Sequence, residues 1–272
     1  MSTGPCSTDC LADVAPTAPP GLRRRRAAAL AVALARASAR PPAGDGRRHA
    51  VCTSARLLTA AGVRVAVLPP TTAWPTGPVL VVANRVSWVD DLALRTAVPA
   101  VPEDDGAVWP GLPTVCAHQV ADALTAGRSV LVRPEATASC GTELGRFRPG
   151  SLAPALAAGT PVCPVAVRAR VGGRPTTVTA HLPGESWWRS AARVLGATDL
   201  VLEVQALPAI DPRRGTAAEV AALAEYAIAE VLEADPPRPI SHPRRPRTHA
   251  AAVTTPAPST APAVSPRTHA PR

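Results

Sequence analysis

The sequence predicts an α/β domain with a largely parallel sheet flanked by helices, and with disordered tails at both ends. Three observations lead to this prediction. Residues 78–83 form a continuous apolar run, which is typical of a strand buried on both faces. Further strand-like runs alternate with helical patterns, as in parallel α/β sheets. Residues 1–20 and 236–272 are rich in proline and small residues and have no periodicity, so we expect no core there.

Two helices and a strand are predicted before the central apolar run. Ala, Leu, Val and Arg dominate residues 21–40 and favour a helix, with an arginine cluster near its start. A second helix is expected over about residues 50–61, followed by a β-rich run at residues 63–68. Two prolines follow that run and end the strand.

The central part of the chain alternates between strand and helix. Strands are predicted at residues 78–83, 129–133, 162–168 and 200–205, and helices at residues 115–126, 152–158 and 216–234. Gly127 and Gly159 are placed to end the first two of these helices.

These elements divide the chain into four segments. Residues 1–20 and 236–272 are expected to be disordered, and residues 21–77 to form an N-terminal helical segment close to a membrane. Residues 78–235 are expected to form the main domain.

The net charge of +9 lies in the flanks of the chain. Residues 1–77 sum to +7, residues 78–235 to −4 and residues 236–272 to +6, which together give +9. The basic flanks could meet anionic lipid headgroups or keep flexible segments solvated. No aromatic platform or known nucleic-acid module accompanies them, so nucleic acid is not expected as a partner.

The six cysteines form no C-x-x-C pair and have no histidine partners at zinc-finger spacing, so no metal site is predicted. The apolar stretch after the arginine cluster is too short for a signal peptide or for the roughly 20 residues of a spanning helix. We therefore expect a cytoplasmic protein, peripheral at most at the inner face of the plasma membrane.

The central apolar strand ends in a turn rich in polar groups, which runs from Asn84 through Arg85 and Ser87 to Asp90. By itself this turn is typical of a strand leading into a helix with a capping Asp. It also resembles the first motif, Asn-His-x-Ser-x-x-Asp, of the 1-acylglycerol-3-phosphate acyltransferases (lysophospholipid acyltransferases). In that family the His takes the proton of the acceptor hydroxyl and the Asp orients it. Here Arg85 stands in the place of the His and cannot act as a base, because guanidinium has no lone pair to offer.

A second block, Arg133-Pro-Glu-Ala-Thr with Arg146-Phe-Arg-Pro-Gly downstream, resembles the family's Phe-Pro-Glu-Gly-Thr and Phe-Arg/Lys-x-Gly segments. The resemblance implies that Asn84, Ser87, Glu135, Thr137, Arg146 and Arg148 bind substrate, with Asp90 catalytic. Arg133 replaces an apolar residue and Ala136 a glycine.

A third block, Gly159-Thr-Pro-Val-Cys-Pro-Val, resembles the family's Gly-x-Pro-x-x-Pro-Val strand. Between the first two blocks, roughly fifteen to twenty residues that family members carry as a strand are missing. A sheet tolerates such a loss more easily at its edge than at its centre.

The resemblance covers residues 78–210 and implies the glycerolipid-acyltransferase fold. It implies an acyltransferase of phospholipid biosynthesis that moves an acyl chain from acyl-CoA or acyl carrier protein to the hydroxyl of a lysophospholipid, without a bound cofactor. Because Arg85 replaces the base, we expect this activity to be weak or lost. The alternative is a catalytically dead relative, a pseudoenzyme that binds a lipid or a protein. Neither the lyso-lipid nor the acyl donor can be chosen from the sequence, and His118 stays open as a replacement base.

Overall fold

The computed structural model describes residues 6, 8–11, 18–39, 46–70, 72–103, 109, 112–135 and 139–234. The segment expected to be disordered at residues 236–272 lies outside these residues, as does most of residues 1–20. Within the latter, a short 3-10 helix, η1 (Thr8–Leu11), is present. In the described part of the chain, no helix is both long enough and apolar enough to cross a membrane.

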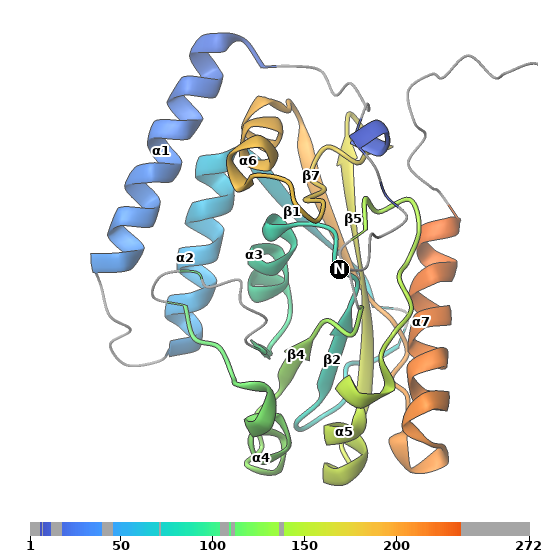
Figure 1. Cartoon of the computed structure of the whole chain (residues 1–272). Helices are drawn as coiled ribbons and strands as arrows, with labels where there is room; N and C mark the ends of the chain where they lie inside the picture. The colour runs from blue at the N-terminus through green and yellow to red at the C-terminus, as the bar shows by residue number, and fades with distance from the viewer. Residues whose placement is uncertain are drawn as a thin grey trace, which may run out of the picture. The chain divides into compact units, whose positions relative to one another are not determined.

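A mixed and mostly parallel sheet forms the centre of the fold (Figure 1). Its strands lie in the order β1-β7-β5-β2-β4-β3, with β6 paired to β5. Their bounds are β1 (Val63–Leu68), β2 (Leu80–Ala83), β3 (Val101–Pro102), β4 (Val130–Val132), β5 (Val162–Val171), β6 (Arg174–Pro175) and β7 (Leu200–Ala206). Strand β5 pairs in parallel with β2 and antiparallel with β7, and β7 pairs in parallel with β1. The sheet therefore includes β1, so it extends to both sides of residue 77.

Helices cover both faces of the sheet (Figure 1). One apolar core joins it to α1 (Pro20–Ala39), α2 (Gly46–Ala61), α3 (Trp88–Ala97) and α6 (Trp187–Gly196). The other core joins it to α4 (Val120–Thr125), α5 (Ala153–Ala158) and α7 (Ala217–Glu233). In β2, Val81 and Ala83 face the first core while Leu80 and Val82 face the second, which explains why this strand is apolar throughout.

The predicted strands and helices correspond to β1, β2, β4, β5 and β7 and to α1, α2, α4, α5 and α7. Gly127 and Gly159 end α4 and α5 with positive φ, as predicted. The strand-to-helix turn at residues 84–90 anticipated the start of α3 but gave no bounds for it, and α6 was missed. Helix α3 is buried almost all round, and its polar residues Asp90, Asp91 and Arg95 are buried with its apolar ones. Helix α6 does carry a helical apolar pattern, at Ala191, Val194 and Leu195, and could have been found from it.

The shortened segment between the first two motifs lies at an edge of the sheet. The edge strand β3 has two residues and pairs with β4, and a single parallel bridge joins Glu103 to Val115 beyond it. The position is the tolerant one, because β2 keeps β4 on one side and β5 on the other.

Candidate active site

The first two motifs meet at one edge of the sheet. Strands β2 and β4 are parallel neighbours, and the motif turn follows β2 while the Pro-Glu block follows β4. The carboxyl ends of adjacent parallel strands are where open α/β sheets place their sites. Four predicted site residues, Asn84, Ser87, Asp90 and Glu135, are buried together here.

The side chain of Asn84 extends the pairing between β2 and β5. Its amide nitrogen donates to the Val167 carbonyl at 3.0 Å, and its amide oxygen accepts from the Val167 N–H at 2.8 Å. The amide nitrogen and oxygen of Asn84 therefore both attach the start of the turn to β5.

Ser87 and Asp90 form the capping box that begins α3. The Ser87 hydroxyl accepts from the Val89 N–H at 3.3 Å. The Asp90 carboxylate accepts from the Val86 and Ser87 N–H groups at 3.1 and 2.7 Å. The turn is thus a strand-to-helix connection in which the predicted catalytic acid also holds the backbone.

Glu135 connects the two motifs. One carboxylate oxygen accepts from the Arg85 N–H at 2.5 Å, and the other accepts from the Gly145 N–H at 2.9 Å. Burial raises the pKa of Glu135 to about 7, and the two N–H donors and the Arg85 charge limit the rise. Glu135 therefore lies within the motif site as predicted, with its carboxylate directed at the backbone of residue 85.

Burial also raises the pKa of Asp90 to about 7, although its two N–H donors and the charge of Arg133 oppose this. Asp90 and Glu135 are thus two buried carboxyl groups near Arg85, the residue at the position where the family has its base. The charge of Arg85 acts on Glu135. Both carboxyl groups can hold or release a proton near neutral pH.

Arg133, which replaces an apolar residue of the family, belongs to a buried ion triad. Its guanidinium contacts Asp91 Oδ1 at 2.7 Å, and Arg95 Nε contacts Asp91 Oδ2 at 2.9 Å. The exposed fractions of these side chains are 5% for Arg133, 1% for Asp91 and 2% for Arg95. Arg133 thus pairs with Asp91, the residue directly after Asp90.

Of the remaining predicted binding residues, Arg146 lies apart from this cluster, Arg148 borders it, and Thr137 is not described. The Arg146 side chain is 96% exposed and lies 3.8 Å from the Glu225 carboxylate. Arg148 is exposed and donates to the carbonyls of Pro134 and Glu135 at 3.4 Å. Thr137 lies outside the described residues.

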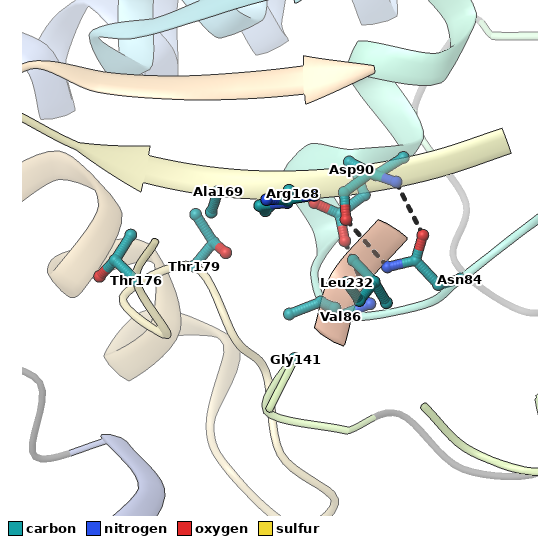
Figure 2. A pocket seen from close by; sticks show the side chains of 10 residues that line it. Asn84, Val86, Asp90, Gly141, Arg168, Ala169, Thr176, Thr179 and Leu232 are labelled. Carbon is teal, nitrogen blue, oxygen red and sulfur yellow. Dashed lines mark hydrogen bonds between the residues drawn. The ribbon is translucent and has the colours of Figure 1, made fainter. Parts of the chain in front are cut away.

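A small cavity touches the motif turn (Figure 2). Asn84 and Asp90 line it together with Thr179, whose buried hydroxyl has no hydrogen-bond partner among the described residues. Its volume of about 20 Å³ suits a single water molecule and is far below that of a lipid headgroup.

His181 is a residue near the site that the sequence did not point to. The backbone N–H of His181 donates to the Val86 carbonyl at 3.0 Å, which places this residue beside the motif turn. Its Nδ1 lies 3.9 Å from a carboxylate oxygen of Glu185, and the side chain is 34% exposed. The predicted alternative, His118, lies in η2 (Ala117–Gln119) with an exposed side chain.

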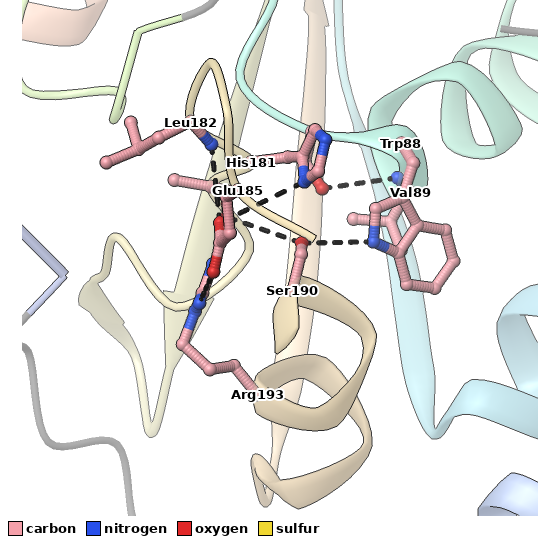
Figure 3. Close-up of polar contacts among 9 residues, drawn as sticks. Trp88, Val89, His181, Leu182, Glu185, Ser190 and Arg193 are labelled. Atoms are coloured by element: carbon pink, nitrogen blue, oxygen red, sulfur yellow. Dashed lines mark hydrogen bonds and ion pairs between the residues drawn. The ribbon is translucent and has the colours of Figure 1, made fainter. Parts of the chain in front are cut away.

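A polar network positions the His181 and Glu185 pair (Figure 3). Arg193 binds both oxygens of Glu185 and lowers the pKa of that carboxyl, which therefore stays ionised. Ser190 connects this loop to α3, because its hydroxyl donates to the Ala180 carbonyl and accepts from the Trp88 indole. A carboxylate that faces an imidazole nitrogen is an arrangement that can support proton transfer.

Comparisons with known proteins agree with this geometry. A family model described as Acyltransferase matches residues 114–168. A lyso-ornithine lipid O-acyltransferase of Pseudomonas aeruginosa is 28% identical over 174 residues, which cover 57% of this chain and 67% of that protein. The crystal structure of the 1-acyl-sn-glycerophosphate (LPA) acyltransferase PlsC from Thermotoga maritima superposes with a TM-score of 0.54 at 18% identity, over 71% of this chain and 81% of the other. The family model, the curated relative and the solved structure thus all support the acyltransferase family that the ordered motifs indicate.

Proposed function

We propose that this protein binds a lysophospholipid and transfers an acyl chain to its free hydroxyl only weakly or not at all. The donor would be acyl-CoA or acyl carrier protein. The observation that carries the proposal is Arg85, which takes the base position of a motif whose other polar groups are buried and hydrogen-bonded together. Loss of a general base costs on the order of 10² to 10⁴ in rate.

The polar groups of the motif remain suited to a headgroup once the site opens. Glu135 could accept from a lipid hydroxyl, and Arg85, Arg146 and Arg148 could meet a phosphate or carboxylate. The water-sized cavity beside Asp90 supports low turnover, since the loop carrying Gly141 would have to move before a headgroup could reach that carboxylate.

Turnover can be measured with acyl-CoA and two acceptors, 1-acylglycerol-3-phosphate and a lyso-ornithine lipid. We expect little product from the wild-type chain and at least a tenfold gain from Arg85→His, which restores a base next to Asp90. The exposed Arg128 provides the matched control, because Arg128→His adds a histidine outside the buried cluster and should bring no gain. Robust wild-type turnover that Glu135→Gln abolishes would contradict the proposal.

A catalytically dead binding protein is the alternative, and the intact network around Asn84, Asp90 and Glu135 supports it. Its signature would be a rise in melting temperature with lysophospholipid, no product, and no gain from Arg85→His. Loss of the thermal shift in Glu135→Gln would assign that binding to the motif site.

Peripheral binding to a membrane is the second part of the proposal. A hollow of about 530 Å³ runs between α1 and α6, with apolar walls that include Leu30 and Leu34. Arg23 and Arg24 border it, and Trp188 is 76% exposed beside it. Arginines next to an exposed indole suit the interface of an anionic bilayer.

Sedimentation with phosphatidylglycerol vesicles tests this surface. Trp188→Ser and the double change Arg23→Gln with Arg24→Gln should each weaken binding. Tyr226→Ser is the control, because this exposed aromatic residue lies on α7 at the opposite face of the sheet. Equal binding by all variants would refute the membrane surface without affecting the acyl-transfer assay.

A further inference from the structure

Three cysteines that are distant in the sequence come together beside the motif turn. Cys6 and Cys10 belong to the N-terminal segment, and Cys140 follows the Pro-Glu block. Their three Sγ atoms lie within 4.8 Å of one another, and the Cys6 and Cys140 sulfurs are 3.4 Å apart. Sequence spacing could not reveal this group, because 134 positions separate Cys6 from Cys140.

The sulfur spacing suits a shared cation. A tetrahedral zinc ion with Zn–S bonds of about 2.3 Å holds its sulfur ligands about 3.8 Å apart. A disulfide would need about 2.05 Å, and could join only two of the three atoms. The sulfurs can therefore become ligands of one ion after sub-ångström adjustments.

The surroundings also favour a thiolate at Cys140. Burial opposes the charged form, but hydrogen bonds with Thr142 and with the neighbouring thiols outweigh burial and lower the pKa of Cys140. The Cys140 N–H donates to the Cys6 sulfur at 3.3 Å. Burial raises the pKa of Cys6 to about 11, so this thiol keeps its proton until an ion displaces it.

We propose that Cys6, Cys10 and Cys140 form a thiolate site for a thiophilic divalent cation, Zn²⁺, with the fourth position taken by water. Three soft sulfur ligands select such a cation over Mg²⁺ or Ca²⁺. Each thiol that binds releases its proton to solvent, and no redox change is involved.

An ion at this site would fasten the N-terminal segment across the motif turn. Cys140 packs in one small apolar cluster with Val86, Ala180 and Leu182, and Cys6 and Cys10 pack against that cluster. The next residue, Gly141, lines the small cavity with Val86. The segment already touches this region, because the Thr177 hydroxyl donates to the Cys10 carbonyl at 2.8 Å. Zinc would thus tie Cys6 and Cys10 to Cys140 beside the motif turn, whether or not the protein transfers acyl chains.

Zinc titration of the reduced full-length chain tests the site directly. We expect one equivalent of Zn²⁺ to bind, as measured by competition with a chromophoric chelator, and Co²⁺ to give intense sulfur-to-metal charge-transfer absorption. Iodoacetamide mapped by peptide mass spectrometry gives a second readout. Zn²⁺ should protect the three clustered thiols and leave the exposed Cys52 and Cys116 reactive.

Serine variants separate this site from other cysteine binding. Cys10→Ser and Cys140→Ser should each abolish stoichiometric binding, whereas Cys52→Ser with Cys116→Ser should retain it. Cys140 is fully buried, so the half-buried Cys10 keeps the test valid if Cys140→Ser fails to fold. Absence of zinc binding, binding that survives Cys10→Ser, or loss of binding in the Cys52 and Cys116 variant would overturn the proposal.

Discussion

At the scale of single residues, two adjacent buried acids have different surroundings. Asp90 accepts hydrogen bonds from the Val86 and Ser87 N–H groups, whereas Asp91 is held by two guanidinium groups. The sequence identified Asp90 through its motif. It did not point to Asp91, and it showed Arg133 only as a departure from the family motif. Arg133 and Asp91 are 42 positions apart, and only the fold brings them together. Arg133 is therefore a matched substitution, which argues against simple decay of the site.

Asp91→Asn should lower the free energy of unfolding by about 3 to 5 kcal/mol, because it removes the charge of the carboxylate that binds both Arg95 and Arg133 in a buried site. Urea denaturation measures this change. Asp199→Asn is the matched control, because Asp199 pairs with Arg64 at the surface and its loss should cost less than about 1 kcal/mol. Equal costs at both positions would show that the triad does not matter for stability.

The raised pKa of Asp90 gives a pH dependence with a defined sign. The folded state keeps this proton up to about pH 7, whereas an unfolded chain releases it near pH 4. The contribution of Asp90 to stability is therefore full at low pH and falls as the pH rises from about 4 to about 7. Asp90→Asn should flatten that fall in urea denaturation series, and the exposed Asp122→Asn should leave it unchanged. A wild-type profile with no such fall would contradict the shift.

At the scale of elements, the motif helix and the loop behind it form one unit. Trp88 at the start of α3 contacts Trp109 and Trp187, with ring centroids 5.7 and 5.6 Å apart. Its indole N–H donates to Ser190 of α6 at 3.2 Å. Because α6 was not predicted, its contact with the start of α3 could not be foreseen. For the same reason the sequence did not indicate that His181 lies beside the motif turn.

Ser190→Ala should lower the free energy of unfolding by about 1 to 3 kcal/mol, because the buried indole N–H of Trp88 then lacks its acceptor. Thermal and urea unfolding both report this loss. Ser186→Ala, an exposed position just before α6 whose side chain caps no backbone group, should stay within about 0.5 kcal/mol of wild type.

Any residual acyl transfer should depend on His181 rather than on His118. His181→Asn is expected to reduce the initial rate about 100-fold, since Glu185 can orient only an imidazole as a base. His118→Asn, the same change at an exposed position, should leave the rate unchanged. Equal rates for wild type and His181→Asn would exclude this histidine from the reaction.

At the scale of the whole molecule, the sequence predicted the architecture better than the site. Among the described residues, apolar runs identified all strands longer than two residues. Strands β2 and β4 are buried throughout, and β1, β5 and β7 are also rich in apolar residues. Site residues with motifs, such as Asn84 and Glu135, could be named in advance. The sequence could not show that backbone groups bind these side chains. Asn84 contacts Val167 and Glu135 contacts Gly145, and the fold alone brings these residues together. Strand β3, which precedes the region where the resemblance implies a shortened segment, lies at the sheet edge beyond the central strands.

The pairing of β1 with β7 has a consequence for biosynthesis. Val63 lies opposite Leu200 and Leu68 opposite Gln205, so β1 finds its partner only after more than half of the chain has been made. At a translation rate of roughly 5 to 20 residues per second, β1 waits on the order of ten seconds for β7 to be synthesised. During this interval its hydrogen-bonding edge and its apolar side chains have no place in the sheet. A chaperone that shields residues 63–68 on the ribosome would therefore raise the yield of folded protein.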